Sequence, residues 1–283
     1  MKVGKGSDNI PMVSFQSVNF YVIDRVERIV SGNGDYDILK SNDINMKNYF
    51  YVETGYHETV SHWLYESAIF LPFYNDLKVI YPDLILYIPN MKKYKELFCS
   101  FLEVPFTTEF VKGSTIICPE PISCLTFREP NSVFNTVVDH FFDIFTPKPT
   151  DIKTKFLVMP RQSKENYIAN NRFIDFSNII DFLEKYKSCT LCLTDTITTL
   201  NDQITVVNES ESIVLSSGGG YLVNSLLVRN KKIYVIGEPN MLEQASKYPL
   251  FKYVMNKGMS LNTVYFYKSD KDVVRAFQKV DNC

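Results

Sequence analysis

Short apolar runs rich in β-branched residues recur along this chain, separated by stretches in which apolar residues follow helical spacing. In the second half the rhythm is regular. It predicts strands over 155–159, 190–193, 212–215, 232–236 and 262–267, with a further short strand-like element in 200–208. Helices are expected at 176–186, after residue 220 and at 270–280. Strands and helices that alternate in this way are typical of a parallel sheet covered on both faces.

The first half is a less regular α/β region. One or two strands are predicted over 13–30 with a turn at 31–34, and Asp35-Tyr36-Asp37 is expected to lie in a solvated loop. Three helices are predicted in the rest of this half, at 59–78, 92–102 and 133–145. Three strands are predicted between them, at 84–88, 106–111 and 114–117. The clearest linker is TPKPT at 146–150. We therefore expect an N-terminal domain over 1–148 and a Rossmann-like domain over 149–283, whose last helix could pack back on the first domain.

One stretch of the second half joins a strand, a glycine turn and a helix. The predicted strand at 212–215 leads through Ser217 to Gly218-Gly219-Gly220, and helical spacing resumes at Leu222. Residues without a Cβ let an anion approach the backbone N–H groups at a helix N-terminus. The simpler interpretation is a tight turn that packs the helix on the sheet. Its place late in a strand–helix series instead favours a nucleotide diphosphate site, and Arg161 after the first strand could pair with the phosphates.

His62 and Glu66 are the candidates for acid–base chemistry. They lie four residues apart in a predicted helix, so they share one face and the carboxylate could orient the imidazole. That is the minimum requirement of a general base. The simpler interpretation is an ordinary ion pair on the helix surface. His57 and Glu58, just before the helix, are weaker candidates of the same type.

Composition narrows the function classes. A hydrophobic fraction of 45% and a charged fraction of 22% are those of a globular protein. A net charge of −2 argues against a general nucleic-acid binder. No segment is long and apolar enough to span a bilayer, and the first residues lack the apolar core of a secretory signal, so we expect a soluble cytoplasmic protein. Three histidines exclude a histidine-rich metal centre, and Cys189 and Cys192 lack a second pair to complete a zinc site.

Three segments, in order, resemble the motifs of one family. The first is His62-Trp63-Leu64-Tyr65-Glu66, followed by a strand that ends at a proline. The second is Phe156-Leu157-Val158-Met159-Pro160-Arg161, with asparagines downstream. The third runs from Asp195 to the glycine-rich turn and Asn224. Together they resemble glycosyltransferase family 61, the DUF563 group, over roughly residues 50 to 240.

The chain departs from that family at two places. The family's glycine turn usually reads His-Gly-Ala-Gly-Leu-Thr-Asn, whereas Gly218 to Asn224 contain neither the histidine nor the threonine. A second arginine expected shortly after Arg161 is replaced by Asn166, which leaves Lys164 as a possible substitute for its charge. These changes affect the contacts to phosphate, but the helix N-terminus is retained.

The resemblance implies an α/β GT-B fold, in which two Rossmann-like domains face each other across a cleft. It implies an inverting transfer without an obligatory metal, from UDP-xylose or UDP-N-acetylglucosamine to an oligosaccharide or glycoprotein glycan. The expected donor-binding residues are Arg161, Lys164, Ser217, Gly218, Gly219, Gly220 and Asn224. His62 and Glu66 would be catalytic, with either of them as the base. A compact chain of this kind would fit the small glycosyltransferases of large algal viruses.

Two other functions fit the same pattern. A polysaccharide pyruvyl transferase also combines a GT-B-like scaffold with a glycine-rich turn, but it would need a basic cluster for phosphoenolpyruvate. The N-terminal half has no obvious cluster of this kind. A non-catalytic sugar-nucleotide-binding protein is the other alternative, and the altered glycine turn favours it.

Overall fold

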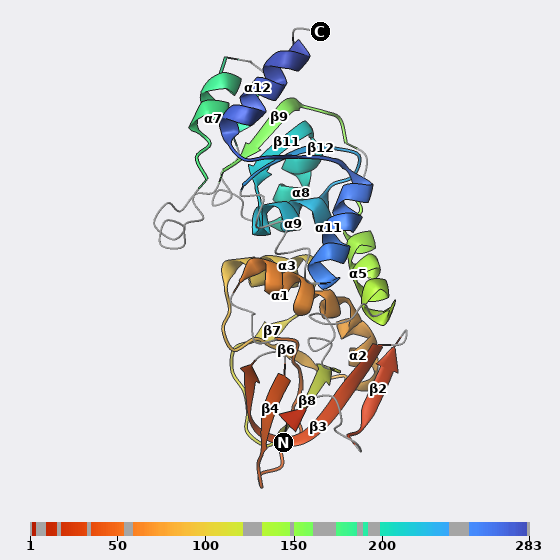
Figure 1. The fold of residues 1–283 in the computed structure, drawn as a ribbon. Coiled ribbons are helices and arrows are strands. Elements are labelled where there is room, and N and C mark those ends of the chain that lie inside the picture. The colour runs from red at the N-terminus through yellow and green to blue at the C-terminus, as the bar shows by residue number, and fades with distance from the viewer. Residues whose placement is uncertain are drawn as a thin grey trace. The chain divides into compact units, whose positions relative to one another are not determined.

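The computed structural model describes residues 2–3, 10–15, 18–32, 35–53, 59–120, 132–147, 150–160, 174–185, 189–191, 199–237 and 249–281. The chain forms a mixed α/β structure with parallel sheets and divides into two compact units, Met1–Phe141 and Phe142–Cys283 (Figure 1). The division falls inside helix α5 (Ser132–Ile144), ahead of the 148/149 boundary that the proline-bearing segment predicted. In the part of the chain that the structure describes, no helix is long and apolar enough to cross a membrane.

The N-terminal unit is built on a mixed eight-stranded sheet. Its order is β1 (Lys2–Val3), β4 (Asp35–Lys40), β3 (Val18–Gly32), β8 (Ser114–Pro119), β5 (Asn48–Phe50), β6 (Ile85–Tyr87) and β7 (Phe106–Thr107), and β2 (Met12–Phe15) also pairs with β3. Strands β8, β5, β6 and β7 pair in parallel, whereas the pairs β1–β4, β2–β3, β3–β4 and β3–β8 are antiparallel. The prediction of a solvated loop at Asp35-Tyr36-Asp37 is wrong, because these residues pair with β3 and begin β4.

Helices of the N-terminal unit connect the parallel strands. The chain from β5 to β6 forms α1 (Val60–Glu66), the 3₁₀-helix η1 (Ala68–Phe73) and α2 (Tyr74–Ile80), and α3 (Lys93–Phe101) connects β6 to β7. A single helix over 59–78 was predicted, but Pro72 lies in its interior and cannot donate an α-helical hydrogen bond. Aromatic rings pack these helices on the sheet: Phe20 of β3 lies 5.9 Å from Phe50 and 5.5 Å from Phe73, measured between ring centroids.

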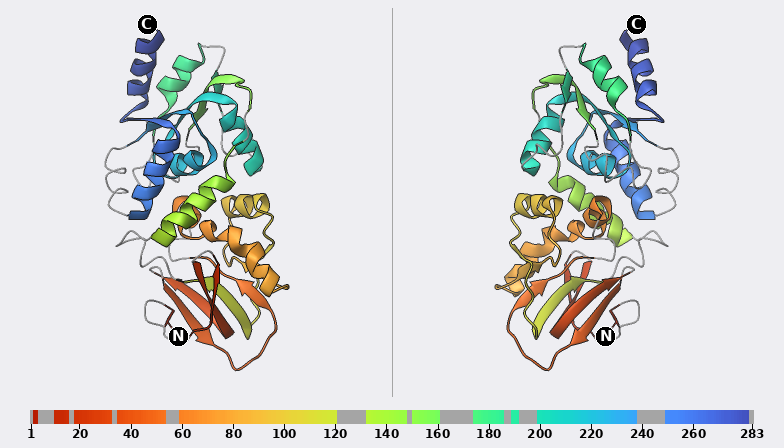
Figure 2. Two further views of the ribbon diagram at one scale, coloured as in Figure 1. Left: turned by 90° about the vertical axis from the view of Figure 1, so that its right-hand side faces the viewer. Right: turned by 90° about the vertical axis from the view of Figure 1, so that its left-hand side faces the viewer.

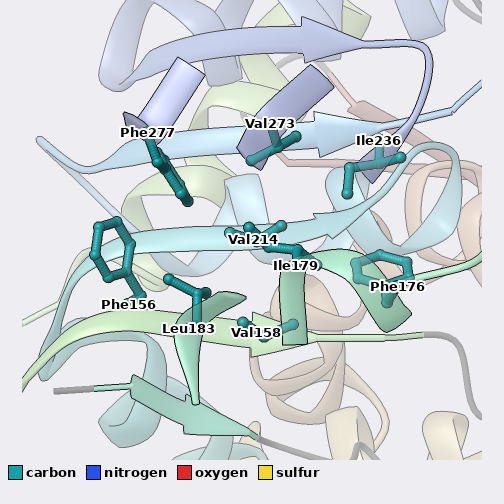
Figure 3. Close-up of a cluster of buried hydrophobic side chains, with 9 residues drawn as sticks. All are labelled: Phe156, Val158, Phe176, Ile179, Leu183, Val214, Ile236, Val273 and Phe277. Carbon is teal, nitrogen blue, oxygen red and sulfur yellow. The ribbon is translucent and has the colours of Figure 1, made fainter. Parts of the chain in front are cut away.

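The C-terminal unit has a five-stranded sheet in which every pair is parallel. Its order is β10 (Cys189–Leu191), β9 (Thr154–Met159), β11 (Ser210–Ser216), β12 (Lys232–Ile236) and β13 (Thr263–Tyr267). Helices α7 (Ser177–Leu183) and α12 (Asp270–Asp281) lie side by side on one face (Figures 1 and 2). Figure 3 shows the apolar cluster beneath them, in which Val214 and Ile236 of the sheet meet Ile179, Val273 and Phe277. Helices α8 (Leu200–Asn208), α9 (Gly219–Leu227) and α11 (Pro249–Leu261) pack together on the other face.

The strand-like prediction for residues 200–208 is wrong, because this segment is helix α8. Thr199 and Asp202 form a capping box: the Thr199 hydroxyl accepts from the Asp202 N–H at 3.1 Å, and the Asp202 carboxylate accepts from the Thr199 N–H at 3.2 Å. This start signal outweighs the β-branched residues that suggested a strand. The terminal helix α12 packs on α7 within its own unit.

Candidate functional site

The glycine turn lies where the strand order of the C-terminal sheet reverses. From β9 the chain moves to β10 on one side and then crosses to β11 on the other side. Met159 at the end of β9 pairs with Leu215 near the end of β11, so the segments that follow both strands emerge next to each other. Such a switch point, outside the carboxyl ends of parallel strands, is where open α/β sheets bind their ligands. Arg161 and Lys164 follow β9, but both lie outside the described residues.

Each of the three positions in the turn has a different structural feature that bears on its being a glycine. Gly218 precedes α9 with φ +79° and ψ −133°, a conformation that favours glycine, and its carbonyl accepts the Leu222 N–H at 3.0 Å. Among the described residues, a Cβ on Gly219 would meet nothing within 4 Å, so the space beside this residue is open there. A Cβ on Gly220 would lie 2.9 Å from the Ser216 hydroxyl. The turn therefore leaves its opening at Gly219.

The N-terminus of α9 also differs from its neighbours in capping. Helix α8 carries the capping box, and the first N–H groups of α7 donate to carboxylates, Ser177 to Asp175 at 2.9 Å and Asn178 to Asp270 at 2.8 Å. The N-cap residue of α9 is Gly218, which has no side chain that could cap the helix. The first-turn N–H groups of a helix have no acceptor within the helix, and its dipole places partial positive charge there. An anion is the natural partner of this end.

Ser217 and Asn224 support the turn from inside the unit. The Ser217 N–H donates to the Ile236 carbonyl at 2.8 Å, and its side chain lies against Gly237, where a Cβ would approach the Ser217 hydroxyl to 1.9 Å. The buried Asn224 amide donates to the Gly220 carbonyl at 2.8 Å and accepts from Gln203 at 3.1 Å. Both residues fix the position of the glycines.

His62 and Glu66 meet in the N-terminal unit as the spacing predicted. The His62 Nδ1 lies 2.6 Å from the Glu66 Oε1. The Glu66 side chain is 1% exposed and that of His62 is 27% exposed, so the carboxylate is buried behind an accessible imidazole. His62 lies in the first turn of α1, the helix that follows β5, and therefore lies towards the carboxyl ends of the parallel strands.

A second pair near the same strand ends was missed in the sequence. Glu53, three residues after β5, forms an ion pair with Lys95 of α3, and both side chains are fully buried. The Lys95 ammonium also donates to the Asn90 carbonyl, beyond β6, at 2.9 Å. The available signal was a carboxylate directly after the apolar run YFYV at 49–52. Its lysine partner is 42 residues away, and no local pattern indicates that distance.

Neither a cluster of metal ligands nor a similar known protein identifies the function of these sites. Within the described residues, no three His, Cys, Asp or Glu side chains are grouped so that they could hold a metal ion, and the absence of a metal requirement stays a prediction. No model of a known protein family matches the chain, and no curated protein matches it.

Proposed function

We propose that this protein is an inverting, metal-independent glycosyltransferase of the GT-B class. It would transfer a sugar from a UDP-sugar, with xylose favoured over N-acetylglucosamine, to a hydroxyl of a glycan acceptor. The observation that carries the proposal is the glycine-lined N-terminus of α9 at the switch point of a parallel sheet. The partial positive charge at this helix end supports a diphosphate as the ligand.

The C-terminal unit would stabilise the leaving group. As the bond between the anomeric carbon and the phosphate oxygen breaks, UDP takes the electron pair and negative charge develops on the diphosphate. The N–H groups at Gly219 and Gly220 and the dipole of α9 would meet that charge without reorganisation. Arg161 and Lys164 belong to the proposal as further donors. Removal of one such donor typically lowers turnover about 100- to 1,000-fold.

The N-terminal unit would supply the base. The exposed fractions favour His62 for contact with the acceptor, because the Glu66 carboxylate is buried behind it. A carboxylate at Nδ1 favours the tautomer that carries the proton on Nδ1 and the lone pair on Nε2. Nε2 would take the hydroxyl proton while the acceptor oxygen attacks the anomeric carbon. Glu66 would then stabilise the imidazolium that forms.

The test changes only the charge at the open glycine. Gly219→Asp places a carboxylate in the first turn of α9, which should stabilise the free protein by up to about 1 kcal/mol through the helix dipole. The same carboxylate should repel a diphosphate. Gly219→Asn is the matched control, with nearly the same shape and no charge. Each variant is melted with UDP, UDP-xylose, UDP-N-acetylglucosamine or phosphoenolpyruvate, with and without EDTA.

A ligand at about 100 times its Kd adds about 2.7 kcal/mol of stability, which a melting curve resolves. We expect the native chain and Gly219→Asn to be stabilised by UDP and one UDP-sugar, and Gly219→Asp to lose that response. Equal UDP responses of the Asp and Asn variants would refute the site. Stabilisation by phosphoenolpyruvate instead would favour a pyruvyl transferase. Binding of a UDP-sugar with neither transfer nor hydrolysis would favour a non-catalytic binding protein.

A further inference from the structure

The buried Glu53–Lys95 ion pair carries a large desolvation cost, and the proposed reaction does not use it directly. Both side chains are fully buried, so both charges have lost their contact with water. Desolvation of a buried pair commonly cancels its attraction, and apolar residues of similar volume often give an equally stable protein. Net stability therefore does not explain the pair. Its geometry does, because it joins α3 to the ends of β5 and β6.

Helix α3 passes this constraint on to α1. Tyr94, next to Lys95 in the sequence, lies 5.7 Å from Trp63 between ring centroids, and Phe98 lies 6.0 Å from the same ring. Both contacts are edge-to-face, and Trp63 is fully buried. Trp63 directly follows His62. One connected set of contacts thus runs from the strand ends through Lys95 and α3 to the helix that carries His62 and Glu66.

We propose that Glu53 and Lys95 are positioning residues that hold the His62–Glu66 pair at the strand ends through α3 and Trp63. The role of this pair in transfer rests on the proposed function, but the positioning itself does not. The ion pair fixes helix α3 in one register because the buried Lys95 ammonium is bound both by the Glu53 carboxylate and by the Asn90 carbonyl. Apolar side chains would allow several packings of similar energy. The pair therefore gives His62 a single orientation.

The first experiment observes the His62 imidazole directly and does not depend on enzymatic activity. The variant Glu53→Leu/Lys95→Met removes both charges and leaves neither one buried alone. Nitrogen-15 spectra of the imidazole are recorded at about pH 8, where an ordinary histidine is neutral, and His62→Gln assigns the signal. We expect one tautomer, with the proton on Nδ1, in the native chain and a mixture of tautomers in the variant. An unchanged signal in the folded double variant would overturn the proposal.

Two further variants protect this test. Tyr94→Leu keeps the ion pair but removes one ring contact to Trp63, so it should produce the same tautomer mixture even if the double variant does not fold. A native signal in Tyr94→Leu would also overturn the proposal. Lys153→Met is the matched control, because it breaks a lysine–glutamate pair in the C-terminal unit whose lysine side chain is 68% exposed. It should leave the His62 signal unchanged.

The second experiment measures transfer or donor hydrolysis. A displaced base lowers turnover without weakening the donor, so we expect turnover of Glu53→Leu/Lys95→Met to fall about 10- to 100-fold with the KM for the UDP-sugar unchanged. Turnover equal to that of Lys153→Met would overturn the positioning role. If the native chain has no activity towards any UDP-sugar, the proposed function fails. The tautomer of His62 still decides the positioning role in that case.

Discussion

Adjacent glycines of the turn should respond in opposite directions to the same added methyl group. Gly218 has φ +79° and ψ −133°, so Gly218→Ala places a Cβ on backbone that L-residues rarely adopt. Strain of this kind costs about 1–3 kcal/mol. Gly219 begins α9 with open space where its Cβ would lie, and alanine in a helix is favoured over glycine by up to about 1 kcal/mol. The two variants should therefore differ by about 1–4 kcal/mol in the free energy of unfolding.

Urea unfolding followed by circular dichroism measures that difference, and hydrogen exchange of the first turn of α9 localises it. At about 3–5 °C per kcal/mol for a unit of this size, Gly218→Ala should melt about 3–15 °C below the native chain. The single tryptophan, Trp63, lies in the N-terminal unit and reports separately on that unit. A Gly218→Ala variant as stable as Gly219→Ala would refute the positive φ. A Gly219→Ala variant destabilised by more than about 1 kcal/mol would refute the open space.

Three further predictions concern the base, a buried amide and alkaline pH. His62→Gln should lower turnover about 100- to 10,000-fold while UDP still raises the melting temperature, and parallel kinetic and thermal measurements check this. Asn208→Ala removes the buried amide that donates to the Ile204 and Leu227 carbonyls at 2.8 and 3.0 Å, so urea unfolding should show a loss of about 1–3 kcal/mol. Burial raises the pKa of Tyr234 to about 12. The folded chain then keeps a proton that the unfolded chain releases near pH 10, so stability should fall as the pH rises from about 10 to 12. Tyr234→Phe should reduce that slope in urea titrations at alkaline pH, and an unchanged slope would contradict the assignment.

The sequence alone determined the features whose cause is local. Strands β9, β11 and β12 were predicted because a short apolar run with β-branched residues indicates a strand from the local sequence alone. The glycine turn before α9 was predicted because residues without a Cβ mark such a turn. The contact between His62 and Glu66 was predicted because residues four apart on a helix are neighbours. The structure of residues 200–208 also has a local cause, because the capping residues Thr199 and Asp202 mark the start of a helix where β-branched residues suggested a strand.

Tertiary structure alone decided the features that depend on distant partners. The order of the C-terminal strands, and with it the switch point beside the glycine turn, depends on which strands pair, and no periodicity carries that information. Ser217 lies against Gly237, and Asn224 accepts a hydrogen bond from Gln203; both contacts join residues about 20 positions apart, and no local pattern indicates them. Glu53 and Lys95 form an ion pair although 42 positions separate them in the sequence. Burial is a property of the assembled fold, so a charge that looks solvated in the sequence becomes half of an ion pair only when helices and strands close over it.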